Sequence, residues 1–222
     1  MKYTIKVNEL KNNEGKVKAL ATVVFGDSFK VGNIAIVEGK DGNVFVSMPR
    51  FKSGSKDKDG NDVYKDICNP ITREFREELY ANIFETYEKE GDKEMFVRIE
   101  ANEEVEMPQF TVSVTPYEKE NSNIRGLARI YIEDSFIINN VTLLQGKNDV
   151  FVAMPSYKTK QTDEQGKAVY QEMCYPVSKE FREKLYGELI GSYNSEKEKQ
   201  TSKKEENNSV EPELPIRDSV HR

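Results

Sequence analysis

The residues best suited to bind a ligand lie in a polar stretch that follows the dipeptide Met48-Pro49. Flexible cations can neutralise phosphate groups, and an aromatic ring beside them can stack on an unpaired base. The same composition also describes a solvated loop whose rings fold back on the protein, because runs of charge are usually just solvated. The candidate nucleic-acid contacts are Arg50, Phe51, Lys52, Lys56, Lys58 and Lys65; Tyr64 is a second ring interleaved with these cations, and the acids among them are Asp57, Asp59 and Asp62.

A second stretch of the same kind follows Met154-Pro155, but it is less basic. Its candidate contacts are Lys158 and Lys160, and the acids Asp163 and Glu164 offset much of their charge. The two stretches can thus have diverged, so that one binds nucleic acid and the other has a supporting role.

Catalytic chemistry has little support in the sequence. The only histidine, His221, lies close to the C-terminus, and neither a Gly-x-Ser-x-Gly elbow nor a Walker loop is present. The neighbouring Glu77 and Glu78 belong on the solvated face of a helix. Residues 55–66 resemble a calcium loop, but Ser55 stands where an aspartate is needed, so a turn built on Asp and Gly is the better interpretation. We therefore expect a protein that is not an enzyme and that needs no metal or other cofactor.

Both polar stretches belong to an internal repeat, which has to be found before any fold is assigned. Residues 48–87 return as residues 154–193 at an offset of 106, and the match continues upstream at an offset of 107. Period-two alternation predicts four strands in each unit, and a helix follows the polar loop of about twenty residues. The first unit's elements are strands at 3–9, 16–25, 29–37 and 44–48, a bulge near Gly32-Asn33, and a helix with N-cap Thr72 and apolar Phe75, Leu79, Ile83 and Tyr87.

These elements predict an α+β fold made of two tandem β-β-β-β-α units, each an antiparallel four-stranded sheet with a C-terminal helix. Residues 1–90 form the first unit and residues 109–193 the second. Residues 91–108 form an acidic linker, in which Met95 to Ile99 is apolar enough to be an added strand or a docked segment. Residues 194–222 are expected to be a disordered, charged tail.

Composition limits the kinds of partner. The formal net charge is −6, and most of the acidic excess lies in the linker, so each unit can still carry a local basic face. No apolar run approaches the ~18 residues of a membrane span. We expect no membrane partner and a cytoplasmic location. Cys68 and Cys174 occupy equivalent positions and are expected to be small buried hydrophobes.

The repeat resembles the SpoVG family, the stage V sporulation protein G or septation-regulator group of bacteria. Residues 44–49, VFVSMP, resemble the strand end of that family, residues 59–70 resemble its DGxFRDIAHP segment, and residues 72–74 begin its following helix. The resemblance implies a dimer-forming unit that binds DNA and RNA to regulate gene expression, septation and sporulation. It also implies that a basic pair after Met-Pro contacts nucleic acid. Here Phe51 and Tyr157 replace the first member of that pair, and Lys52 and Lys158 keep the second.

A fused repeat turns the pairing of two copies into an intramolecular step. We therefore expect an intramolecular pseudo-dimer, whose exposed sheet edges could still recruit further copies of the chain. The first functional hypothesis is a regulator that binds DNA or RNA, or both. The alternative hypothesis is a protein-interaction module that has lost contact with nucleic acid.

Overall fold

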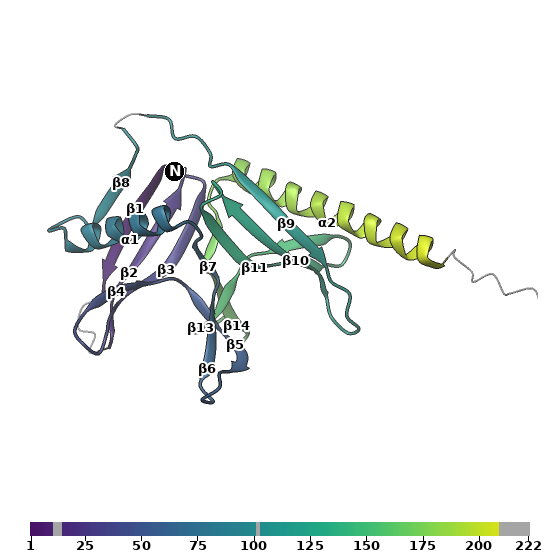
Figure 1. Ribbon diagram of the computed structural model, residues 1–222, viewed down its shortest axis with the longest axis horizontal. Coiled ribbons are helices and arrows are strands. Elements are labelled where there is room, and N and C mark those ends of the chain that lie inside the picture. Colours follow the sequence, from purple (N-terminus) through teal and green to yellow (C-terminus); the bar gives the residue numbers. More distant parts are fainter. Residues whose placement is uncertain (11–14, 101–102, 209–222) are drawn as a thin grey trace, which may run out of the picture.

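Two antiparallel sheets, each covered by a helix, lie next to each other in the computed structural model (Figure 1), which describes residues 1–10, 15–100 and 103–208. The first unit contains β1 (Tyr3–Glu9), β2 (Val17–Phe25), β3 (Phe29–Glu38), β4 (Val44–Ser47), β5 (Arg50–Lys56), β6 (Asp62–Asp66), β7 (Cys68–Pro70) and α1 (Arg73–Glu88). The strand β8 (Glu94–Val97) follows. The second unit contains β9 (Phe110–Pro116), β10 (Ile124–Ile132), β11 (Phe136–Gln145), β12 (Val150–Ala153), β13 (Ser156–Thr162), β14 (Ala168–Glu172), β15 (Cys174–Pro176) and α2 (Lys179–Asn208).

The sheets form because apolar residues alternate along the strands and need a cover on one face. Tyr3 and Ile5 are fully buried on that face of the first sheet, and Phe75, Leu79 and Ile83 of α1 pack over it. The helix begins where the sequence predicts, because the hydroxyl of Thr72 accepts a hydrogen bond from the backbone N–H of Phe75 at 3.3 Å. Ser178 caps α2 in the same way through the N–H of Phe181, at 3.2 Å.

The predicted bulge is confirmed in both units. Asn33 in β3 and Asn140 in β11 each have a φ of 58°, in the left-handed region that asparagine tolerates better than most residues. The pairing of β2 with β3 shifts by one residue at this point, so Val31 and Ile34 both remain on the buried face. The equivalent shift occurs between β10 and β11.

The two units exchange strands. The short strand β7 of the first unit pairs with β11 of the second, with Cys68 opposite Ile138. In return β15 pairs with β3, with Cys174 opposite Val31. Arginines in the first turn of each helix donate to the carbonyls at the ends of these strands, Arg76 to Pro70 at 3.3 Å and Arg182 to Pro176 at 3.1 Å. The chain is therefore an intramolecular pseudo-dimer in which each half completes the other's sheet.

A shared core lies where the halves meet. The rings of Phe25 and Phe136, one from each unit, lie with centroids 5.1 Å apart, and both are fully buried. Cys68 and Cys174 are also fully buried there as free thiols. The hydrogen bond with Cys174, together with burial, raises the pKa of the Cys68 thiol well above its ordinary value.

Three segments differ from, or add to, the predicted elements. The polar loop after each Met-Pro is a two-stranded β-ribbon, β5 with β6 and β13 with β14. The apolar part of the linker forms β8, which pairs with β1 and so extends the first sheet, as one of the two predicted alternatives stated. Helix α2 continues to Asn208, so the prediction of a disordered tail is wrong for residues 194–208. The rest of the predicted tail, residues 209–222 with His221, lies outside the described residues.

Candidate nucleic-acid interface

The candidate contact residues lie on two β-ribbons that project from the junction of the two sheets (Figure 1). Each ribbon turns around an aspartate. Asp57 accepts backbone hydrogen bonds from Asp59 at 2.9 Å and Asn61 at 2.8 Å, and these donors hold the pKa of its carboxyl below the ordinary value. Asp163 has the same role in the second ribbon. The segment that resembles a calcium loop is therefore a hairpin turn.

The first ribbon places most of the predicted cations on one face. Arg50 stands opposite Asp66, Lys52 opposite Tyr64, and Lys56 opposite Asp62. Both lysine ammonium groups lie 2.6 Å from the carboxylate of Asp62, and their hydrogen bonds lower the pKa of that carboxyl. Cations and acids are therefore interleaved along this face, and part of its positive charge is neutralised.

The other predicted cations are exposed and less constrained. Lys58 lies in the turn of the first ribbon and Lys65 on β6, while Lys158 and Lys160 lie on β13. None of these four lysines forms an ion pair with the part of the chain that the structure describes. They are therefore the cations of the ribbons most available to an anionic partner.

One arrangement is common to both ribbons. Lys52 pairs across the strands with Tyr64, and its counterpart Lys158 pairs with Tyr170. The two tyrosines are 54% and 64% exposed, which is high for an aromatic residue in a strand. Each ribbon thus presents an ammonium group next to an open ring. The sequence placed Tyr64 among the cations of the first stretch but did not indicate Tyr170, although a Val-Tyr pair repeats at the offset of 106 and gave the signal.

Phe51 is not the open ring of the first ribbon. Its ring is half-buried against the core, at the root of the first ribbon, so Tyr64 is the open ring there. Phe51 also lines a hollow of about 560 Å³ between the first ribbon and the outer face of the second sheet. Lys65 and the exposed Arg129 line the same hollow. The second unit's sheet therefore adds a cation that the sequence did not predict as a contact.

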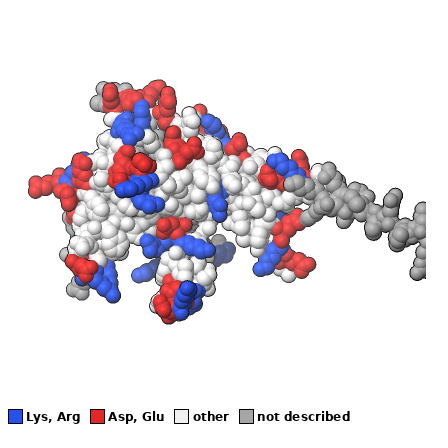
Figure 2. All heavy atoms as spheres, in the orientation of Figure 1, with Lys and Arg blue, Asp and Glu red and all other residues white. Residues whose placement is uncertain are grey.

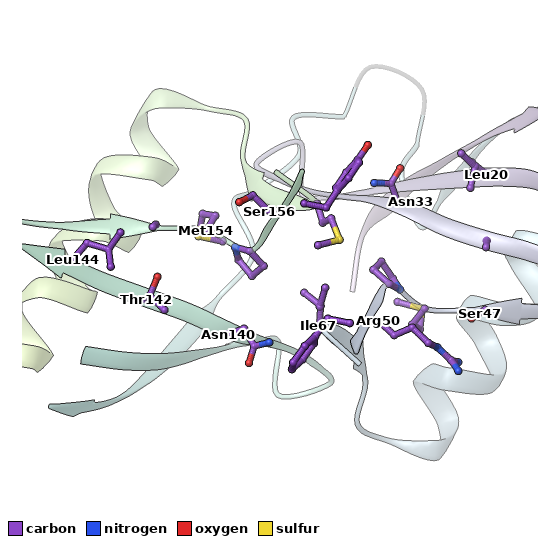
Figure 3. A pocket seen from close by; sticks show the side chains of 18 residues that line it. Leu20, Asn33, Ser47, Arg50, Ile67, Asn140, Thr142, Leu144, Met154 and Ser156 are labelled. Carbon is purple, nitrogen blue, oxygen red and sulfur yellow. The ribbon is translucent and has the colours of Figure 1, made fainter. Parts of the chain in front are cut away.

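A larger pocket of about 960 Å³ opens between the roots of the two ribbons (Figure 3). Equivalent residues of the two halves line it, because the halves are related by a pseudo-two-fold axis. Its lining includes the pairs Asn33 and Asn140, Ala35 and Thr142, Ser47 and Ala153, Met48 and Met154, Pro49 and Pro155, Arg50 and Ser156, Phe51 and Tyr157, and Ile67 and Met173. Among the described residues that line the pocket, only Arg50 is charged.

The surface charge around these features is mixed. Figure 2 shows acidic and basic side chains next to each other at the tip of the first ribbon and largely uncharged surface over the sheets. Within the described residues, no three His, Cys, Asp or Glu side chains are grouped as metal ligands. None of the helices described combines the length and apolar composition needed to cross a bilayer.

Fold and site together define a class of protein: a tandem α+β repeat whose halves exchange strands and jointly present a pair of β-ribbons. The SpoVG family profile matches the chain twice, over residues 1–89 and 107–195. The chain therefore belongs to the SpoVG family, and it contains two SpoVG units.

Curated relatives support this assignment, and each spans about one unit. Septation protein SpoVG of Alkaliphilus oremlandii is 42% identical over 81 residues, which is 36% of this chain and 80% of the relative. That of Finegoldia magna is 34% identical over 92 residues, or 41% of this chain and 79% of the relative. That of Clostridium perfringens is 41% identical over 76 residues, or 34% of this chain and 77% of the relative.

Proposed function

We propose that the chain is a non-enzymatic regulatory protein of the SpoVG type that binds DNA or RNA through its two ribbons, in a process linked to septation. The observation that supports this most directly is the lysine and tyrosine pair that occurs in both ribbons. A lysine can neutralise a phosphate, and an exposed ring next to it can stack on a base. Two such pairs, one on each ribbon, offer two contacts of this kind to one nucleic-acid strand.

The shape of the ribbons also suits this role. A two-stranded ribbon is narrow enough to enter the major groove of a DNA duplex, and its exposed strands can equally lie along a single strand. Four lysines of the ribbons, Lys58, Lys65, Lys158 and Lys160, are free of intramolecular ion pairs in the described chain. The acids of the first ribbon limit the net positive charge, so we expect modest affinity, with a salt dependence set by the few phosphates that these lysines neutralise.

Fluorescence polarisation with labelled DNA and RNA, at salt concentrations from about 50 to 200 mM, tests the proposal directly. The double variant Lys52→Ala/Lys158→Ala should weaken binding. It should also flatten the dependence of log K on log salt by about 0.7 to 0.9 for each phosphate that the protein no longer neutralises. A double variant of two lysines on the projecting part of α2, Lys197→Ala/Lys199→Ala, removes the same charge far from the ribbons and is the matched control. If both double variants weaken binding equally, the ribbons are not the contact surface.

A protein-interaction module is the second candidate, and the acids of the first ribbon favour it. Asp62 binds two lysines and Asp66 lies 3.9 Å from Arg50, which leaves a mixed surface typical of protein interfaces. Affinity capture from lysate, with and without nuclease, separates the two functions. A defined protein partner that survives nuclease treatment, together with no binding of nucleic acid at about 50 mM salt, would replace the first proposal by the second.

A further inference from the structure

The pocket between the ribbon roots has the size and lining of a binding site, which phosphate contacts by the ribbons alone do not require. Its volume of about 960 Å³ lies at the upper end of the range for small-molecule sites, about 300 to 1,000 Å³. Both halves contribute to it, so it exists only in the assembled pseudo-dimer. Arg50 and Phe51 at the start of β5, and Ser156 and Tyr157 at the start of β13, lie on its lining. The pocket is therefore continuous with the proposed contact surface of the ribbons.

Two asparagine side chains face this pocket from opposite halves. Figure 3 shows Asn33 and Asn140 on separate walls of the cavity. Both occupy the left-handed bulge position, with a φ of 58°, a conformation that is unfavourable for a residue with a Cβ atom. Neither side-chain amide forms a hydrogen bond with the part of the chain that the structure describes. Asn140 is exposed and Asn33 half-buried, so each unit places an amide donor and acceptor that are open to a ligand at the same site.

The remaining walls suit a flat, uncharged ring. The thioethers of Met48, Met154 and Met173 line the pocket, and methionine sulfur makes favourable contacts with aromatic rings. Phe51 and Tyr157 add aromatic surface from the two halves. Arg50, whose side chain is 49% exposed, supplies the single positive charge. Apolar walls, two amides and one cation are complementary to a nucleobase attached to a phosphate.

We propose that this pocket receives unpaired bases of a single-stranded nucleic acid, with Asn33 and Asn140 hydrogen-bonding to base edges and Arg50 contacting a backbone phosphate. The inference rests on the proposed function of the ribbons and makes it more specific. A duplex keeps its bases stacked and paired, so it cannot place them in a pocket, whereas a single strand can turn them outward. The protein should therefore bind single strands more tightly than duplexes of the same length.

The bulge geometry offers a substitution that removes the amide without disturbing the backbone. Glycine adopts a positive φ at no steric cost, so Asn33→Gly/Asn140→Gly keeps the bulge and deletes both amides. Asn121 has a φ of 60° in the exposed loop between β9 and β10 and does not line the pocket. Asn121→Gly is therefore the matched control for the same chemical change.

Polarisation with a labelled single strand of about twelve nucleotides and with its duplex, at about 50 mM salt, is the test. A good amide contact to a base changes the binding affinity by roughly tenfold. We therefore expect the double variant to bind the single strand at least about tenfold more weakly. Its duplex affinity, and both affinities of Asn121→Gly, should change less than about twofold. A 2-aminopurine placed in the single strand should report base unstacking with the wild-type protein and lose that signal with the double variant.

The outcomes separate this inference from the proposed function. Wild-type protein that binds the single strand and the duplex equally well, or a double variant that binds the single strand like wild type, overturns the pocket proposal and leaves the ribbon proposal standing. Wild-type protein that binds neither form overturns both. Circular dichroism melting of each variant confirms that the compared proteins are folded.

Discussion

Phe136 tests whether the two halves of the chain are one cooperative unit. Its ring is fully buried and meets Phe25 of the other half, with centroids 5.1 Å apart. Replacing a buried phenylalanine by alanine removes its burial free energy and leaves a cavity, at a cost of about 3 to 5 kcal/mol in the free energy of unfolding. With a urea m-value of about 2.5 kcal/mol/M, the Phe136→Ala midpoint should fall by about 1 to 2 M.

Which strands the substitution destabilises is a sharper test than how far the urea midpoint falls. Because β7 and β15 are exchanged and the core is shared, unfolding of the second half removes both β15 and the ring of Phe136 from the first half. We expect a single unfolding transition in urea. The fluorescence of the 11 tyrosines can monitor it, because the chain has no tryptophan. Hydrogen exchange should accelerate in β2 and β3 of the first half as much as in β10 and β11.

Phe151 is the control for Phe136. It lies in the same half, but its ring is 48% exposed, so Phe151→Ala should move the urea midpoint very little. Two separate transitions for Phe136→Ala, or exchange that accelerates in the second half alone, would show that the halves fold independently. The shared core and the strand exchange would then contribute little to cooperativity.

Three further predictions concern single sites. Gly187→Ala and Gly191→Ala should each raise the free energy of unfolding by about 0.5 to 1 kcal/mol in thermal melts, since a Cβ atom at either helical position meets nothing within 4 Å. The Cys68 and Cys174 thiols should resist Ellman's reagent at about pH 8 until urea is added, because both are buried and the pKa of Cys68 is raised; rapid labelling of native protein would contradict this. The pKa of Asp62 is lowered in the folded state, so its contribution is present above the unfolded pKa of about 3.9 and is lost as the pH falls through the folded pKa. Asp62→Asn should accordingly make the decrease in stability below about pH 4 shallower, and an unchanged acid profile would show that its ion pairs are not stabilising.

The parts of the fold that the sequence predicted are those set by local physics. Alternating apolar residues located the sheet strands, Thr72 marked the start of its helix, and Gly32-Asn33 marked the bulge, because each signal acts within a few residues. Helix α2 ran longer than predicted because its last turns are rich in glutamate and lysine. These residues are good helix formers that need no core, and pairs such as Lys199 with Glu196 add to them.

Local sequence patterns did not predict the ribbons or the strand exchange. Both faces of the β5 and β6 ribbon are largely exposed, so the apolar alternation that identifies a strand is weak there. The strand β7 spans only three residues, and its partner β11 lies in the other unit. Pairing of that kind is decided by tertiary packing. The sequence consequently indicated the cations and Tyr64, while Tyr170 and the pairing of each tyrosine with a lysine became visible only in the ribbons.

Fusion of two units also permits an asymmetric pocket, which a symmetric dimer cannot form. In a homodimer every residue of a pocket on the two-fold axis appears twice, so a cation there would face its own copy. Here Arg50 lines the pocket in one half and Ser156 takes its place in the other, which leaves a single positive charge. If the pocket receives a strand as proposed, its single charge should give that strand a defined direction, whereas a symmetric pocket would accept it in either direction. Introducing the second charge, Ser156→Arg, should therefore weaken the preference for one strand direction in a crosslinking assay, and an unchanged preference would show that Arg50 does not set the direction.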